Sequence, residues 1–209
     1  MANYEYVPKT EVRPYEKLFE DVFREIQKEI RKEEGLTFSF ALVGSAKRNL
    51  VVRHHNKGFD CDYQLYLQKN KKKLSAKEIK ELLMKKFDEK MPSEFDYCED
   101  STSSITIKKK ITEESRIEFS YDIVIMKLCD DNFQIIRKNG SGQYVWNKLP
   151  DFTSFDEDYS KIKGAAMWED LRQCYYDKKI DKDNGAQEYK DKKSFQLLHQ
   201  AVKETLSRF

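Results

Sequence analysis

Two aspartates one residue apart, Asp60 and Asp62, are the residues whose types and spacing most directly suggest chemistry. They lie at the start of an apolar stretch, 59–67, that has the composition of a β-strand. Because side chains along a strand alternate between its two faces, both carboxylates should project from the same face. Two neighbouring carboxylates repel each other unless a cation lies between them, so the pair predicts a site for a hard divalent ion.

A glycine and a serine, Gly44 and Ser45, follow an earlier apolar strand, 37–43, whose near-continuous apolar character is typical of a central strand. Glycine lets a backbone approach a phosphate closely, and serine offers a hydroxyl and an N–H group to it. The loop that follows is basic and begins with Lys47 and Arg48. These residues predict a phosphate site beside the two aspartates, although an ordinary strand-to-loop turn would use the same glycine and serine.

A third carboxylate, Asp122, interrupts a later apolar strand. A buried ionised carboxylate is costly without a cation or hydrogen bonds, so this one needs a partner; an edge position or a lysine partner would also serve. If its strand lies beside that of Asp60 and Asp62, the three carboxylates converge, and two divalent ions about 3.5–4 Å apart would fit among them. The expected ion is Mg²⁺, with Mn²⁺ as an alternative. One ion would hold a triphosphate, and the other would lower the pKa of an attacking hydroxyl, with Asp122 as the ligand or base for that hydroxyl.

Taken together, the segment GSAKRN at 44–49, the Asp-x-Asp strand and Asp122 resemble the nucleotidyltransferase superfamily typified by DNA polymerase beta. The pattern is most similar to the branch of poly(A) polymerases, oligoadenylate synthases and bacterial cyclic-oligonucleotide synthases, and small bacterial nucleotidyltransferases share it. The resemblance covers about Phe38 to Met126. It implies a mixed-sheet catalytic core and Mg²⁺-dependent transfer of a nucleotide from an NTP to a hydroxyl, with release of pyrophosphate.

The same resemblance implies roles for single residues. Asp60 and Asp62 would hold both metal ions, and Asp122 would hold the catalytic one. Gly44 and Ser45 would contact the phosphates, and we add Lys47 and Arg48 to the predicted nucleotide site. The C-terminal segment KKSFQLLHQAV is similar to the helix of the poly(A) branch that gives a lysine and a serine to the triphosphate, which points to Lys193 and Ser194. A plain helix start is the alternative for these two residues.

Periodicity predicts the elements that must position these residues. A helix is expected from Pro14 until Gly35, after a polar arm at 1–13, because apolar residues recur there at three- and four-residue steps. A Ser75–Glu78 capping box opens the next helix. The remaining expected elements are strands at 59–67, 103–111, 114–128, 133–137 and 143–146, the last two flanking an Asn-Gly-Ser-Gly turn, and helices at 75–90, 159–178 and 194–207.

Composition limits the protein class. Charged residues make up 36% of the 209 residues, but 13 Phe and 12 Tyr are too many aromatics for a disordered chain. The formal net charge of +2 does not by itself argue for a nucleic-acid partner. The four cysteines are widely spaced, which favours free thiols, and no run has the length of a membrane span. We expect a cytoplasmic protein with no membrane partner.

The sequence thus predicts an α+β nucleotidyltransferase fold: a mixed central sheet with flanking helices at 1–150 and a helical C-terminal segment at 151–209, packed on the core. The expected function is transfer from an NTP, with ATP as the default donor, to a hydroxyl on a small molecule, a protein, an RNA or a second nucleotide. Two alternatives stay open. The chain is a non-catalytic or antitoxin-like binding member of the same fold, or it is an RNA-binding protein that uses the basic loop with the lysine runs 71–73 and 108–110.

Overall fold

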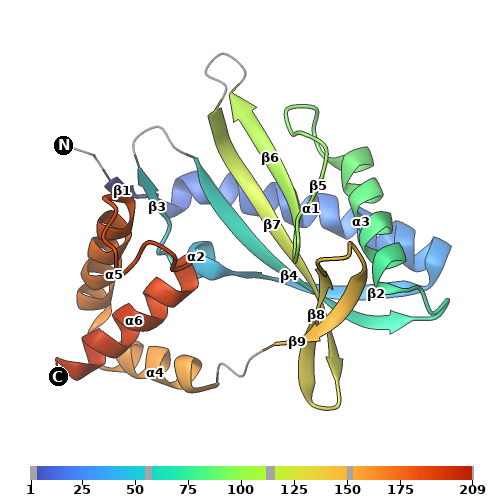
Figure 1. Cartoon of the computed structure of the whole chain (residues 1–209). Helices are drawn as coiled ribbons and strands as arrows, with labels where there is room; N and C mark the ends of the chain where they lie inside the picture. The colour runs from blue at the N-terminus through green and yellow to red at the C-terminus, as the bar shows by residue number, and fades with distance from the viewer. Residues whose placement is uncertain (1–3, 55–57, 112–115, 150–152, 209) are drawn as a thin grey trace. The chain divides into compact units, whose positions relative to one another are not determined.

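The computed structural model describes residues 4–54, 58–111, 116–149 and 153–208. The chain divides into two compact units, Met1–Leu149 and Pro150–Phe209. The first combines a mixed sheet with helices, as the predicted α+β class requires (Figure 1). Its elements are β1 (Tyr4–Tyr6), α1 (Lys9–Glu34), β2 (Leu36–Val43), α2 (Gly44–Lys47), β3 (Val52–His54), β4 (Phe59–Asn70), α3 (Ala76–Lys90), β5 (Glu99–Asp100), β6 (Ile105–Ile111), β7 (Arg116–Cys129), β8 (Asn132–Lys138) and β9 (Tyr144–Lys148).

The main sheet has the strand order β2-β4-β7-β6-β5, and β8 and β9 continue from the end of β7. The pair β4 and β7 is parallel, whereas β2–β4, β6–β7, β7–β8 and β8–β9 are antiparallel, so the sheet is mixed. The prediction that strand 37–43 is central is wrong, because β2 lies at one end of this order. Its apolar composition reflects packing against α1 instead: the Phe40 ring lies 5.2 Å from that of Phe23.

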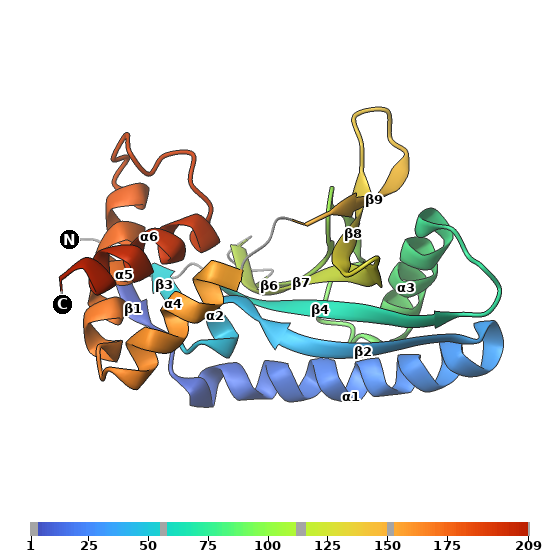
Figure 2. The same cartoon turned by 90° about the horizontal axis from the view of Figure 1, so that it is seen from below.

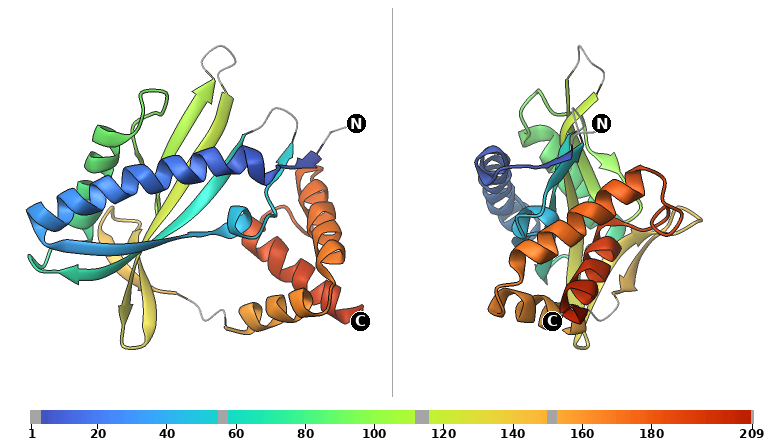
Figure 3. Two further views of the ribbon diagram at one scale, coloured as in Figure 1. Left: turned by 180° about the vertical axis from the view of Figure 1, so that it is seen from behind. Right: turned by 90° about the vertical axis from the view of Figure 1, so that its left-hand side faces the viewer.

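Helix α1 covers one face of the sheet and runs along β2 and β4 (Figure 2). Its apolar stripe is fully buried at Phe19, Phe23, Ile26 and Ile30, and the Phe19 ring stacks on Tyr63 of β4 at 3.7 Å. Helix α3 lies beside the C-terminal half of α1 (Figure 3). Burial of these large side chains, at roughly 1.5–3 kcal/mol each, is the main force that fixes the sheet behind the predicted site.

The first helix begins earlier than predicted. It starts at Lys9 after an extended Pro8, so Pro14 lies inside it, and the expected arm contains β1. The cause is a long-range contact that periodicity does not reveal: β1 pairs with β3, and the Val7 N–H donates to the Val51 carbonyl. The predicted end is confirmed, because Gly35 adopts a left-handed φ of 64°.

Two local predictions in the first unit are confirmed. Ser75 and Glu78 form the expected capping box at the start of α3. The β8–β9 hairpin encloses the Asn-Gly-Ser-Gly turn, where the Asn139 side chain accepts hydrogen bonds from the backbone N–H groups of Ser141 and Gln143. The start of the predicted strand 114–128 lies outside the described residues, and its described part forms β7.

The second unit is helical. The single helix predicted at 159–178 is wrong, because two helices share this region and the chain turns between them at Ala166, with a φ of 57°. Its buried residues include Phe155, Leu171 and Leu197. None of the helices in the described ranges of either unit is long and apolar enough to cross a membrane. The elements are α4 (Thr153–Gly164), α5 (Trp168–Asp183) and α6 (Ser194–Ser207).

Candidate active site

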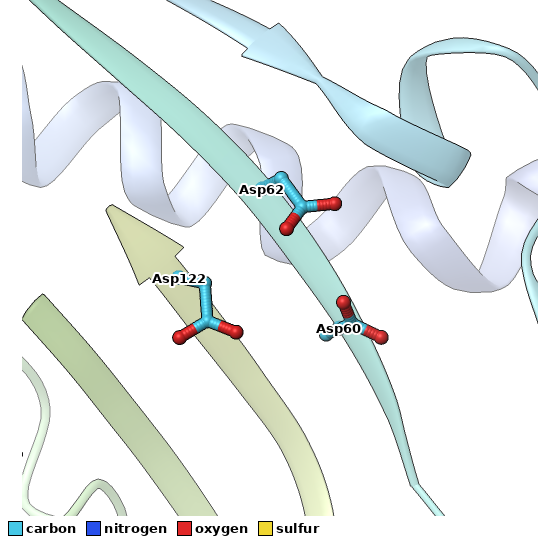
Figure 4. Close-up of side chains that lie close together, drawn as sticks. All are labelled: Asp60, Asp62 and Asp122. Carbon is cyan, nitrogen blue, oxygen red and sulfur yellow. The ribbon is translucent and has the colours of Figure 1, made fainter. Parts of the chain in front are cut away.

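The three aspartates meet on two adjacent strands of the main sheet. Asp60 and Asp62 lie on β4 and Asp122 lies on β7, and the parallel register places Asp62 directly opposite Asp122. One carboxylate oxygen from each residue lies within 4.8 Å of the others, as their side chains in Figure 4 illustrate. The structure therefore brings together the three residues that the sequence selected, and their catalytic roles stay predictions.

Alternation along β4 separates the acidic face from the core. Cys61 and Tyr63 point into the core and are buried, whereas Asp60 is exposed and Asp62 is half-buried. Asp122 is half-buried on the same face as the other two aspartates. Burial, with nearby carboxylates, raises the pKa of the Cys61 thiol. This cysteine therefore stays a neutral thiol on the far side of the strand, which excludes a thiolate metal ligand there.

Gly44 lies in contact with Asp62. Its φ is 66°, and a Cβ atom at this position would lie 1.9 Å from the Asp62 Oδ2 atom. The contact follows from the β2–β4 pairing, which sets Val43 opposite Asp62. Glycine is therefore needed here for two reasons, its left-handed backbone and the space taken by a carboxylate.

The segment after Gly44 folds back on itself. The Ser45 carbonyl accepts hydrogen bonds from the N–H groups of Arg48 and Leu50, at 3.2 and 2.9 Å. Arg48 donates from its guanidinium to the Gly44 carbonyl at 3.1 Å, and Lys47 is exposed. Gly44 and Ser45 thus start the short α2 helix immediately beside the acidic cluster, with two cations following them. Their contact with a nucleotide stays a prediction.

The donor set fits a hard divalent cation. Carboxylate oxygens are the ligands that Mg²⁺ and Mn²⁺ prefer, and three of them converge here on a face that is open to solvent. Three negative charges within this distance repel each other in the absence of a cation. The residues present therefore match the predicted cofactor in charge, in ligand type and in access.

A polar network behind Asp122 had no clear signal in the sequence. The Thr106 hydroxyl donates to Asp122 Oδ1 at 2.5 Å and lies 3.0 Å from the Ser101 hydroxyl. Further from the cluster, the buried ammonium of Lys80 donates to the Ser101 carbonyl at 2.6 Å and pairs with Asp100 at 2.7 Å. Nothing in the sequence of the helix expected at 75–90 indicates that Lys80 is buried, because its burial depends on tertiary packing.

Asp100 makes stability depend on acid pH. Burial tends to raise the pKa of this carboxyl, but hydrogen bonds from Lys80, Tyr144 and Lys138 outweigh it and lower the pKa from 3.8 to about 2. A lowered folded-state pKa gives stability that is present above about pH 4 and is lost as the pH falls through 2. Asp100→Asn should therefore lower the free energy of unfolding at pH 7 by roughly 2 kcal/mol and weaken its dependence on pH between 4 and 2.

Urea unfolding of both proteins at several pH values tests this prediction. The control is Asp21→Asn, which removes an exposed carboxylate 3.6 Å from Arg24 and should change stability by less than about 1 kcal/mol at every pH. Equal pH slopes for Asp100→Asn and the wild-type protein would contradict the assignment.

Basic side chains proposed for RNA are mostly engaged with acids. Lys72 pairs with Glu34 at 2.7 Å. Its neighbour Lys71 lines a cavity of about 560 Å³ between α1, the start of β2 and the end of β4. Arg53 hydrogen-bonds to Glu5 and Glu11. These pairs reduce the positive charge available to a nucleic-acid backbone. The three consecutive lysines of β6 also have acidic partners, with Lys108 pairing with Glu99, Lys109 with Glu118 and Lys110 with Asp96.

Lys193 and Ser194 stand at the start of α6 in the second unit, and both are exposed. Lys179 donates to the Ser194 hydroxyl at 3.0 Å, and the Lys193 N–H donates to the Gln196 side chain at 2.8 Å. These contacts are those of a helix start. The predicted role of the two residues in triphosphate binding stays a prediction.

Comparison with known proteins gives a match in structure only. No family model matches the sequence, and no curated protein matches it. The GTP-bound and 3′-deoxy-ATP-bound structures of Vibrio cholerae DncV each superimpose with a TM-score of 0.58 at 17% identity, over 83% of this chain and 46% of theirs. DncV, a cyclic AMP-GMP synthase, in complex with the linear intermediate 5′ pppA(3′,5′)pG gives 0.53 at 16% identity, over 71% of this chain and 40% of that one.

This chain therefore spans a little under half the length of DncV. At such low identity the likeness concerns the fold alone. The prediction of a mixed-sheet α+β fold of this type is confirmed. The chain has the nucleotidyltransferase fold.

Proposed function

We propose that this chain transfers a nucleotide from an NTP to a hydroxyl acceptor, with release of pyrophosphate, and that Mg²⁺ binds at its three aspartates. The observation that carries the proposal is the convergence of Asp60, Asp62 and Asp122 beside Gly44, on an open face of a nucleotidyltransferase fold. Three clustered carboxylates repel each other unless a cation lies among them, and the Gly44 corner lies immediately beside them.

The residues divide the work by position. Asp60 and Asp62 would hold the divalent ion, which when bound neutralises phosphate charge and lowers the pKa of a coordinated hydroxyl. Asp122 would also hold this ion, and it would orient the acceptor hydroxyl and take its proton. The acceptor oxygen then forms a bond to the α-phosphorus as the bond to pyrophosphate breaks. Gly44 and Ser45 would place backbone N–H groups against the departing phosphates, and Lys47 and Arg48 would add positive charge.

For the substrates, we propose ATP as the donor and a second nucleotide as the first acceptor to test. The supporting observation is that DncV structures of this fold contain GTP, 3′-deoxy ATP and a linear dinucleotide intermediate. A second nucleotide carries the sugar hydroxyl that such a transfer needs. Small-molecule, protein and RNA acceptors are the alternatives that the experiment separates.

The decisive experiment is a product analysis with α-labelled NTPs, offered singly and in pairs with Mg²⁺, with and without added RNA. Pyrophosphate release with a new nucleotide-linked product supports the proposal. Label on protein or RNA would identify that molecule, rather than a second nucleotide, as the acceptor. The matched control is Asp62→Asn, which keeps the side-chain shape. Tight NTP binding without turnover would favour the non-catalytic alternative, and salt-sensitive RNA binding without NTP would favour the RNA-binding one.

Divalent ions should stabilise the folded protein. Mg²⁺ that binds only the folded state adds about 2.7 kcal/mol to the free energy of unfolding at 100 times its dissociation constant, because binding shifts the folding equilibrium by mass action. Thermal unfolding with increasing Mg²⁺, against KCl of equal ionic strength, measures the effect. An identical response of the wild-type protein and Asp62→Asn would argue against a metal site here.

A further inference from the structure

Thr106 lies beside the acidic cluster, on the strand next to Asp122. The antiparallel pairing of β6 and β7 sets Thr106 directly opposite Asp122, while its neighbours Ile105 and Ile107 point into the core. Thr106 is only 8% exposed, and its hydroxyl donates to Asp122 Oδ1 at 2.5 Å. A hydroxyl bonded to a carboxylate at this distance makes a strong, charge-assisted hydrogen bond.

The direction of the hydrogen bond from Thr106 to Asp122 determines the direction of the hydrogen bond between Ser101 and Thr106. An ionised carboxylate only accepts hydrogen bonds, so the single proton of the Thr106 hydroxyl is committed to Asp122. The Ser101 hydroxyl, 3.0 Å from the Thr106 oxygen, must therefore donate to it. Ser101, Thr106 and Asp122 form a one-way chain of donors that ends on the carboxylate.

The Ser101 end of this series of hydrogen bonds is held in place by buried charged residues. Lys80 of α3 is 1% exposed, donates to the Ser101 carbonyl and pairs with the neighbouring Asp100. Asp100 in turn accepts hydrogen bonds from Lys138, at 2.9 Å, and from the Tyr144 hydroxyl. These contacts join α3, β5, β8 and β9 at one point. Ser101 therefore has little freedom to move relative to the sheet.

We propose that Thr106 is a positioning residue for Asp122, which holds one carboxylate oxygen so that the other is presented to a divalent cation shared with Asp60 and Asp62. Figure 4 shows one Asp122 oxygen directed toward the other two aspartates and the second directed away from them. Without Thr106 the carboxylate can rotate, and its alignment for metal binding is lost. This inference rests on the proposed function, because it concerns the same metal site.

Metal binding itself tests the role without any assay of activity. Mn²⁺ is titrated into the full chain without nucleotide, and free Mn²⁺ is followed by electron paramagnetic resonance. Thr106→Val keeps the branched shape but removes the hydroxyl, and it should weaken Mn²⁺ affinity about tenfold or more, as loss of a residue that orients a ligand does. Thr106→Ser keeps the hydroxyl and should stay within about twofold of the wild-type protein.

Thermal unfolding without metal separates positioning from a merely structural role, which would lower stability and leave affinity unchanged. If Thr106→Val fails to fold, Ser101→Ala, which removes the donor to Thr106, should still weaken Mn²⁺ binding. Wild-type Mn²⁺ affinity in Thr106→Val, or equal losses of affinity in Thr106→Val and Thr106→Ser, would overturn the role of Thr106 but not the metal site. A wild-type protein that binds no Mn²⁺ would overturn the metal site together with the inference, so the two failures are distinguishable.

Discussion

Replacing Asp62 with asparagine is expected to lower nucleotide transfer by about a thousandfold or more, because loss of a charged ligand removes several kcal/mol of transition-state stabilisation. Asp62 stands at the centre of the cluster, opposite Asp122 in the sheet and against Gly44. Asparagine has the same shape, so the core behind it, including the buried Cys61 and Tyr63, should be unchanged.

The same substitution should leave the free energy of unfolding unchanged or slightly raised in the absence of divalent ions, since it removes one of three mutually repelling charges. Transfer is measured by pyrophosphate release, and stability by urea unfolding with a chelator present. Asp21→Asn removes an exposed carboxylate from α1 and should retain full activity. An active Asp62→Asn would show that the cluster is not the catalytic site.

Gly44→Ala is expected to be the second most damaging substitution. The new methyl group would overlap Asp62 Oδ2 at 1.9 Å, so either the carboxylate or the α2 corner must move. A displacement of about 1 Å at a catalytic group costs on the order of a hundredfold in rate. The left-handed backbone adds a cost of about 1–2 kcal/mol to folding.

Gly142→Ala separates these two effects. Gly142 also has a left-handed φ, 79°, but a Cβ atom there would meet nothing within 4 Å. It should therefore lose about the same stability from the backbone and keep full transfer activity. Rates and unfolding free energies of both variants provide the comparison. Equal activity of the two would mean that the contact between Gly44 and Asp62 does not position the carboxylate.

Local signals predicted much of this structure because they depend on short spacings. The two-residue period placed Asp60 and Asp62 on one face of β4, and the capping box located the start of α3. Asp122 was recognisable because a charge in an apolar strand needs a partner. Each of these inferences needed only residues that are close in sequence.

The remaining features depend on contacts between distant segments. Nothing local shows that β1 pairs with β3, which moves the start of α1 to Lys9, or that β2 ends the sheet. The role of Thr106 beside Asp122 depends on the register of β6 and β7, and the burial of Lys80 depends on where α3 packs. The family resemblance, rather than periodicity, suggested that the strands of Asp60 and Asp122 are neighbours.

The parallel pairing of β4 and β7 has a consequence for divergence. Asp62 and Asp122 meet because backbone hydrogen bonds align their strands, and those bonds do not depend on which side chains the neighbouring positions carry. Substitutions at neighbouring positions are therefore compatible with this pairing as long as the register of the two strands is kept. A single residue inserted within either strand would instead turn a carboxylate to the opposite face. The acidic centre of this protein therefore depends on the register of two backbones rather than on the identity of the residues around it.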